Sequence, residues 1–326
     1  MFWLLARHSV AMGQLVNGAW SEESPAARQS KDGKFEREAS PLRRVVDADP
    51  AAEFPAEAGR YHLYVNVGCP WAYRAVLMRR LKGLENVISM SCTQPGMGPE
   101  GWTFLSSDGA SSDDFTHKRN LHEVYVASDD HYTGRVTVPV LWDKQSQSIV
   151  NNESSEIIRM FNSAFSSFTD DSIDYYPAHL RADIDTINER VYERVNNGVY
   201  RAGFAGSQAA YKEACELLFA ELDSLDDLLA NQRFLVGDQI TEADWRLFST
   251  LLRFDLAYYS RFRCNLKRIV DYANLWPYAR DLFQQPRVAE TIDWHAFKAI
   301  YWSGSGIIPL GPTDDWSAPH GRERLN

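Results

Sequence analysis

A cysteine flanked by glycine and proline is the residue best suited to chemistry in this sequence. Cys69 lies in the run Gly68-Cys69-Pro70-Trp71-Ala72, which follows an extended apolar segment and opens a helical one. A cysteine between a strand end and a helix N-terminus faces free backbone N–H groups and the positive end of the helix dipole. Both favour the thiolate, so we expect Cys69 to have a lowered pKa and to act as a nucleophile.

The other cysteines do not complete a dithiol site. Cys69 is followed by Pro-Trp-Ala, so a mixed disulfide formed on it has no neighbouring thiol to resolve it. An external thiol must do so, which points to glutathione. Cys92, Cys215 and Cys264 lie in segments with apolar or helical patterns, and they are predicted to be buried and inert. The wide spacings argue against a disulfide framework or a metal site and favour a reducing compartment.

Two further motifs suggest a binding site for an extended peptide. In Val138-Pro139, a proline that opens a strand is expected to be cis and to turn the Val138 backbone outward. At Asn152-Glu153-Ser154, the N–H groups of a helix start can bind a carboxylate, Ser154 can donate to it, and Glu153 can receive an ammonium group. The alternatives are an ordinary edge-strand proline and plain helix capping by Asn152 or Ser154.

The elements that position these residues alternate between extended and helical patterns. This order favours an α/β layer fold. In the helix after Cys69, Arg74, Arg79 and Arg80 are expected to reach water. The expected elements are a strand over 61–67, a helix over 71–82, a strand over 87–92, a long loop or insertion over 93–116, strands over 136–142 and 148–150, and a helix over 153–162.

The rest of the chain divides into a leading arm and a helical second half. Long helical periods dominate from about residue 178, and Thr241 to Asp244 form a capping box, so we expect an all-α bundle. Residues 12–58 are polar and predict a surface arm with a few apolar anchors. The predicted parts are an arm over 1–58, a thioredoxin-like domain over 59–165, a linker near 163–177 and a helical domain over 175–326, and the expected anchors of the arm are Leu15, Val16, Trp20 and Phe35.

Bulk composition excludes several classes of function. The chain has 326 residues and a net charge of -10, so it has no basic surplus with which to neutralise nucleic-acid phosphates. No apolar run approaches the roughly 20 residues that span a bilayer, so we expect a cytoplasmic protein without nucleic-acid or membrane partners. The short apolar run Met1 to Ala11 is interrupted by Arg7 and His8. It favours a loose extension over a targeting segment, with Met12 as an alternative start.

Several long motifs, in the expected order, resemble glutathionyl-hydroquinone reductases, the xi class of glutathione transferases. The likeness covers about Gly13 to Pro312. A single CPxA motif would also suit the omega class. The motifs are GQLVNGAW and GKFERE in the arm, CPWA at Cys69, VPVLWD at Val138, NNES at Ser154, NNGVYRAGFA at Tyr200, text similar to LTEAD at 240–244, and GIIPLGP near the end.

The resemblance implies a role for each matching residue. Cys69 corresponds to the catalytic thiol, and Trp102 resembles the residue that lies against glutathione. Arg135 and Val138 resemble the positions that hold its glycyl end and its backbone. Glu153 and Ser154 resemble the clamp for its γ-glutamyl end. The tyrosines that line the acceptor pocket correspond to Tyr200, Tyr258 and Tyr301, with Tyr192 and Tyr259 as neighbours that a pattern match can confuse with them.

The activity implied is reductive removal of glutathione from a glutathionyl-hydroquinone, through a mixed disulfide on Cys69. Glutathione would be the co-substrate, with no metal or nucleotide cofactor, and the chain would be a homodimer. Two alternatives remain: an omega-like thiol transferase acting on dehydroascorbate or on mixed disulfides, and a non-enzymatic binding module of the same architecture. The aromatic residues of the predicted helical domain favour the aromatic substrate. The presence of Cys69 together with the γ-glutamyl clamp residues Glu153 and Ser154 argues against the binding module.

Overall fold

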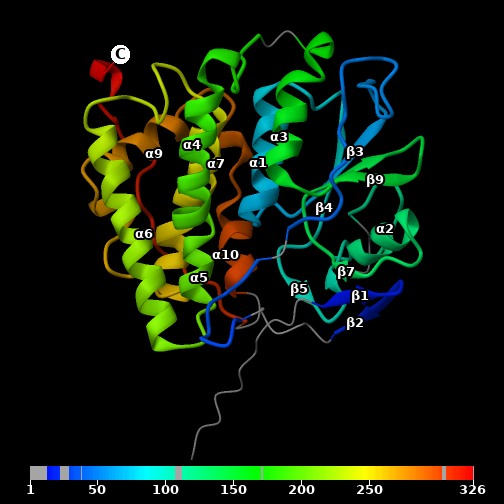
Figure 1. Cartoon of the computed structure of the whole chain (residues 1–326), viewed down its shortest axis with the longest axis horizontal. Coiled ribbons are helices and arrows are strands. Elements are labelled where there is room, and N and C mark those ends of the chain that lie inside the picture. The colour runs from blue at the N-terminus through cyan, green and yellow to red at the C-terminus, as the bar shows by residue number, and fades with distance from the viewer. Residues whose placement is uncertain are drawn as a thin grey trace, which may run out of the picture.

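The computed structural model describes residues 13–22, 29–37, 39–106, 112–169, 172–302 and 306–325. The expectations for Met1 to Ala11 therefore lie outside the described residues. Two layers of different kinds lie side by side (Figure 1), a mixed sheet with its helices and an array of helices. The thioredoxin-like and all-α parts predicted from the sequence are both present. The limits assigned to the domains stay a prediction.

The central sheet has four strands in the order β4-β3-β8-β9. It consists of β3 (Tyr61–Val65), β4 (Ser89–Cys92), β8 (Val140–Asp143) and β9 (Ser148–Asn151). Strands β3 and β4 are parallel, whereas β8 is antiparallel to both β3 and β9. Every residue of β3 and β8 is buried. This matches the position of both strands in the middle of the sheet. Strand β8 begins four residues later than expected, after Pro139.

Helices α1 (Pro70–Leu81) and α3 (Ser154–Ser163) pack against each other beside this sheet (Figure 1). Helix α1 also packs on α7 of the helical part, so it joins the two layers. This position overturns the expectation for Arg74, which is only 2% exposed. Its Nη2 donates to Asn196 Oδ1 at 2.8 Å, because this face of α1 is covered by the helical part and not by water.

The insertion after β4 contains more regular structure than a long loop. Strands β5 (Met97–Gly98) and β6 (Gly101–Trp102) form a small antiparallel pair. Helix α2 (Leu121–Ser128) and the short strand β7 (Gly134–Arg135) follow. Helix α2 was not expected from the sequence. Tyr125 of α2 donates its hydroxyl to the carbonyl of Thr137 at 2.8 Å, which ties this helix to the segment before β8.

The N-terminal arm contains regular structure and forms hydrogen bonds with both layers of the fold. Strands β1 (Gln14–Val16) and β2 (Ala19–Ser21) form a hairpin, and β1 also pairs with β7. Farther along the arm, Gly33 accepts a backbone hydrogen bond from Gly206, and Arg44 donates to Val150 of β9. The arm thus runs from the insertion to the helical part and then back to the sheet (Figure 1). Leu15 and Phe35 are buried as expected, but Val16 is 47% exposed, so its prediction as an anchor is wrong.

The helical part is built around α6 and α7. Both helices begin with a side-chain cap, at Ser207 for α6 and at the predicted Thr241–Asp244 capping box for α7. Its helices are α4 (Arg181–Val191), α5 (Gly198–Gly203), α6 (Gln208–Leu229), α7 (Glu242–Arg253), α8 (Tyr259–Arg261), α9 (Leu275–Phe283) and α10 (Trp294–Trp302), with π-helical turns at Tyr192–Asn196 and Phe254–Tyr258. Short 3-10 turns lie at Ser166–Phe168, Ala178–Leu180, Ile269–Asp271, Ala289–Thr291 and Glu323–Leu325.

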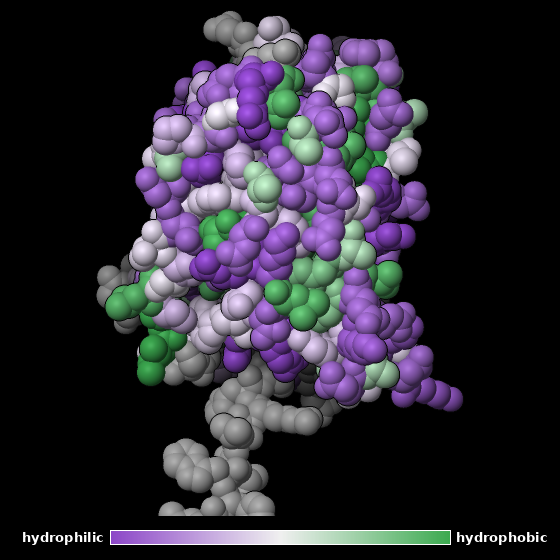
Figure 2. Space-filling model, turned by 90° about the vertical axis from the view of Figure 1, so that its left-hand side faces the viewer, coloured by the Kyte–Doolittle hydropathy of each residue, from purple (hydrophilic) through white to green (hydrophobic). Residues whose placement is uncertain are grey.

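One apolar core runs through both layers, from Leu15 of the arm to Phe297 of α10. The face of the helical part that points away from the sheet is mostly hydrophilic, with separate hydrophobic areas (Figure 2). No helix within the described residues combines the length and the apolarity needed to cross a lipid bilayer.

Candidate active site

Cys69 is the N-cap residue of α1, immediately before Pro70 at the first helical position. Its backbone is extended, with φ -71° and ψ 124°, so the chain turns from strand to helix at the cysteine. The backbone N–H of Cys69 donates to the carbonyl of Asn66 at 3.0 Å and to its Oδ1 at 3.2 Å. This short turn fixes Cys69 at the strand-to-helix junction that the sequence predicted. The side chain is 8% exposed.

The electrostatics of Cys69 differ from the expectation. Burial raises the pKa of the Cys69 thiol, against the predicted lowering. The backbone N–H groups of Ala72 and Trp71 oppose this shift, as the helix N-terminus predicts. The positive charges of Arg253 and Arg37 oppose it as well. The sequence pattern identified the stabilising N–H groups, but it could not reveal how deeply the sulfur is buried.

Arg253, at the end of α7, holds the loop that precedes Cys69, a role that no pattern in the sequence indicates. Its Nε donates to the carbonyl of Gly68 at 2.8 Å, and its Nη2 donates to the carbonyl of Val67 at 3.0 Å. The guanidinium lies 3.7 Å from the ring centroid of Phe297 in α10. Arg253 is fully buried. It therefore connects the cysteine loop to the helical part with hydrogen bonds from a charged donor.

Three of the five glutathione-binding residues implied by the resemblance, Val138, Glu153 and Ser154, lie beside the adjacent ends of β8 and β9. The Val138–Pro139 peptide is cis, as predicted. Val138 is 5% exposed, and its backbone has no backbone hydrogen-bond partner within the described residues. Glu153 is the N-cap of α3, and its Oε1 accepts from the Ser155 N–H at 3.0 Å. Capping therefore falls to Glu153 and not to Asn152 or Ser154. Ser154 is the buried first residue of α3.

Trp102 and Arg135 lie in β6 and β7, in the part of the chain that the N-terminal hairpin contacts. Trp102 ends β6 and is 7% exposed. Arg135 ends β7 and pairs with Gln14 of β1. The hairpin residue Trp20 donates its indole N–H to the Pro99 carbonyl at 2.9 Å, beside this β5-β6 pair. The arm thus contacts β7 and the β5-β6 pair, which carry the predicted glutathione-side residues Arg135 and Trp102.

The three predicted acceptor-pocket tyrosines form one hydrogen-bonded cluster. The hydroxyls of Tyr258 and Tyr301 are 2.8 Å apart, and those of Tyr200 and Tyr301 are 3.4 Å apart. Burial raises the pKa of all three, and the charge of Cys69 raises that of Tyr200 further. The cluster is therefore protonated at neutral pH. It lies beside the helix that Cys69 caps, because the ring centroids of Tyr200 and Trp71 are 6.2 Å apart. Tyr192 and Tyr200 both lie beside Trp71, with ring centroids 5.9 Å and 6.2 Å from that of Trp71.

Of the other cysteines, Cys215 and Cys264 are buried as predicted, whereas Cys92 is only partly buried. All four cysteines are free, and burial raises the pKa of Cys92 to about 11 and the pKa values of Cys215 and Cys264 as well. Within the residues that the structure describes, no group of three or more His, Cys, Asp or Glu side chains is arranged to hold a metal ion.

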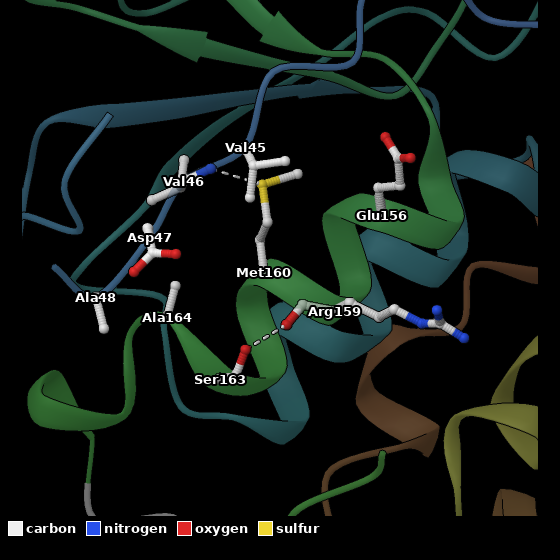
Figure 3. A pocket seen from close by; sticks show the side chains of 9 residues that line it. All are labelled: Val45, Val46, Asp47, Ala48, Glu156, Arg159, Met160, Ser163 and Ala164. Carbon is white, nitrogen blue, oxygen red and sulfur yellow. Dashed lines mark hydrogen bonds between the residues drawn. The ribbon is translucent and has the colours of Figure 1, made fainter. Parts of the chain in front are cut away.

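A separate pocket lies between arm residues 45–48 and α3 (Figure 3). Val46 donates its backbone N–H to Met160 Sδ at 3.1 Å in this pocket, and Ser163 Oγ donates to the Arg159 carbonyl at 2.9 Å. None of the residues lining it belongs to the group around Cys69. The candidate site therefore rests on Cys69 and its neighbours and not on this surface pocket.

The comparisons with known proteins agree with this geometry. Residues 68–164 match the family described as glutathione S-transferase, N-terminal domain, and residues 208–281 match glutathione S-transferase, C-terminal domain. The chain is 47% identical to glutathionyl-hydroquinone reductase YqjG of Escherichia coli, covering 96% of this chain and 99% of that one. It is 49% identical to glutathionyl-hydroquinone reductase PcpF of Sphingobium chlorophenolicum, covering 92% and 96%.

Solved structures show the same relationship. A glutathione-bound structure of the Escherichia coli protein superimposes with a TM-score of 0.86 at 44% identity, covering 95% of this chain and 99% of that one. A xi-class glutathione transferase from Natrialba magadii gives a TM-score of 0.91 at 44% identity, covering 97% and 98%. The thioredoxin-like domain, the cysteine at its first helix and the helical domain define a cysteine-type glutathione transferase. Within that class, the chain belongs to the glutathionyl-hydroquinone reductases of the xi class.

Proposed function

We propose that this chain is a glutathionyl-hydroquinone reductase that removes glutathione from a hydroquinone ring and uses a second glutathione as the reductant. The observation that carries the proposal is the position of Cys69 at a helix N-terminus, two residues before Trp71, whose ring centroid lies 6.2 Å from that of Tyr200. The hydroxyl of Tyr200 in turn lies 3.4 Å from that of Tyr301. A thiol beside protonated phenols supplies both a nucleophile and proton donors, which is what this reaction needs.

The glutathionyl half of the substrate binds on the thioredoxin-like side. The Val138 backbone takes the extended peptide, and the start of α3 takes the γ-glutamyl end, with its carboxylate at Ser154 and its ammonium at Glu153. Trp102 lies against the peptide, and Arg135 holds its glycyl carboxylate. The ring then lies toward the helical part. The resemblance to a relative whose structure holds glutathione supports this assignment, as do the positions of Val138, Glu153 and Ser154 beside the adjacent ends of β8 and β9.

The reaction proceeds in two thiol steps. The Cys69 thiolate attacks the glutathione sulfur and forms a Cys69–glutathione disulfide. The carbon–sulfur bond breaks, its electron pair goes to the ring carbon, and that carbon takes a proton from the cluster of Tyr200, Tyr258 and Tyr301. The thiolate of a second glutathione then attacks the glutathione sulfur of the mixed disulfide, which releases glutathione disulfide and restores the Cys69 thiolate. The ring carbon is reduced, and the two glutathione sulfurs are oxidised.

Two further properties belong to this proposal. The enzyme acts in a reducing compartment, because its mechanism requires a free Cys69 thiol and a supply of glutathione. It assembles as a homodimer, as its resemblance to the xi class implies. Light scattering of the full chain tests the dimer, and a monomer at micromolar concentration would contradict it.

The test of the function mixes the protein with glutathionyl-menadiol and excess glutathione. We expect hydroquinone and glutathione disulfide to appear in equal amounts, and the release to vanish in Cys69→Ser. A wild-type protein that releases no hydroquinone, yet reduces dehydroascorbate through Cys69, would instead assign the omega-like thiol transferase activity. Retention on immobilised glutathione with no turnover of either substrate would indicate a binding module.

A further inference from the structure

The N-terminal arm places an arginine inside the group of residues that forms the acceptor pocket. Arg37 Nε donates to Asn197 Oδ1 at 2.9 Å, immediately before α5. Neighbouring contacts fix the same part of the arm on the helical part, since Lys34 forms an ion pair with Glu213 and the ring of Phe35 lies 5.6 Å from that of Phe204. Arg37 is therefore held in place by several contacts and is not a loose side chain.

The guanidinium of Arg37 lies between an aromatic residue of each domain. It is 4.9 Å from the ring centroid of Trp71, two residues after the cysteine, and 4.9 Å from that of Tyr200. The rings of Trp71 and Tyr200 are themselves 6.2 Å apart. Arg37 thus contacts both Trp71, in the helix that Cys69 caps, and Tyr200 of the tyrosine cluster. Its charge reaches both groups, since it lowers the pKa of Cys69 and that of Tyr200 against the effect of burial.

The hydrogen-bonding capacity of Arg37 is only partly used. A guanidinium carries five N–H donors, and within the described residues only the Nε–H of Arg37 has a hydrogen-bond partner. No carboxylate among those residues forms an ion pair with it. The side chain is half-buried, so its Nη groups are not shut inside the core. A positively charged donor with free N–H groups, fixed beside the rings of Trp71 and Tyr200, suits an oxygen on an aromatic ring.

We propose that Arg37 is a specificity-determining residue of the acceptor pocket, and that its Nη groups bind a hydroxyl or phenolate oxygen of the hydroquinone ring. This inference rests on the proposed function for the place of the ring, but it goes further by assigning recognition of the ring oxygen to the arm. The pocket then selects oxygenated aromatic rings over plain ones. Selection arises because a ring without oxygens leaves the desolvated guanidinium donors unpaired.

The test compares two glutathione conjugates that differ only in the ring oxygens. In the full-length Cys69→Ser protein, which cannot turn over, calorimetry measures the affinity for S-(2,5-dihydroxyphenyl)glutathione and for S-phenylglutathione. We expect Arg37→Gln to weaken binding of the dihydroxyphenyl conjugate about tenfold, the effect of one hydrogen bond from a charged donor. Binding of the phenyl conjugate should change less than about twofold. Arg37→Lys should keep part of the preference because it keeps a charged donor.

Lys34→Gln is the matched control, because it removes an arm contact of the same segment at the exposed ion pair with Glu213. It should leave both affinities unchanged. Equal losses for the two conjugates in Arg37→Gln would show that Arg37 only supports the fold, and unchanged affinities would show that it does not contact the ring. Either result overturns the inference. The proposed function is tested separately, because its failure would appear as a protein with Cys69 intact that releases no hydroquinone.

Discussion

Arg253 donates from Nε to the carbonyl of Gly68 at 2.8 Å, although the two residues are 185 positions apart in the sequence. This bond and the one to the Val67 carbonyl hold the loop before Cys69 against the helical part. Arg253 also donates from Nη1 to the Ser249 carbonyl at 2.8 Å. A fully buried guanidinium with three carbonyl partners makes the active-site loop depend on both domains.

Arg253→Met should therefore destabilise the protein by about 3 kcal/mol or more, since it leaves buried carbonyls without donors. It should also raise the pKa of Cys69, because the charge of Arg253 acts to lower it. Urea unfolding checks the first effect, and the pH dependence of Cys69 alkylation by iodoacetamide checks the second. Arg261→Met, at a side chain in α8 that lies 5.6 Å from the ring of Trp302, is the control. Alkylation profiles that coincide with the wild type would contradict the electrostatic part.

Gly68→Ala should damage the site by steric conflict with α10. A Cβ at Gly68 would lie 2.6 Å from the backbone oxygen of Ala296 and 3.1 Å from Ile300 Cβ. The first contact is too short for the backbone to stay in place, and the second is tight, so we expect a loss of about 1–3 kcal/mol, as in other overpacked sites, together with slower turnover. Gly98→Ala is the control, because a Cβ there meets no atom within 4 Å. Equal stability of the two variants in urea would disprove the conflict.

Sequence reasoning succeeded where the signal is local. The strand-to-helix turn at Cys69, the cis peptide before Pro139 and the capping box at Thr241 each depend on residues within a few positions, and each is present. The hairpin of the arm was missed although its turn, Asn17-Gly18, is a strong hairpin signal. Both turn residues have positive φ, 49° and 76°.

Residues whose role depends on distant partners could not be found this way. Arg253 reads as one more residue of an amphipathic helix until the fold brings Gly68 to it. Arg37 lies in a stretch used only for its family resemblance, and Arg74 was expected to reach water because the sequence does not reveal that the helical part covers α1. The burial of Cys69 likewise depends on the packing of the whole fold, which is why the predicted lowering of its pKa was wrong.

Tyr258→Phe should slow hydroquinone release without affecting the thiol. The variant removes the hydroxyl that lies 2.8 Å from that of Tyr301, so the proton-donating cluster loses its shortest hydrogen bond. We expect turnover to fall by about 10²-fold, the lower range for a positioned general acid, with an unchanged rate of Cys69 alkylation. Tyr259→Phe, at the next residue but without a hydrogen bond to Tyr200 or Tyr301, serves as the control. Equal turnover in both variants would remove the cluster from the mechanism.

Acid should weaken the thioredoxin-like domain through His62. Burial lowers the pKa of His62 to about 4, while Asp113 acts to raise it and Lys144 and Arg79 act to lower it further. Its ring nitrogens lie 2.7 Å from Ser89 Oγ and 3.0 Å from Ser91 Oγ. The unfolded chain binds a proton on His62 near pH 6.5, whereas the folded chain does so only near pH 4. Above pH 6.5 the histidine is neutral in both states and costs no stability. As the pH falls from 6.5 to 4, the unfolded state gains the proton first, so the folded state loses up to about 3 kcal/mol of stability.

We expect the free energy of unfolding in urea to fall more steeply over this range in the wild type than in His62→Gln, which has no proton to gain. His131→Gln, at an exposed histidine, should follow the wild type. A wild-type curve parallel to that of His62→Gln would show that His62 carries no such penalty.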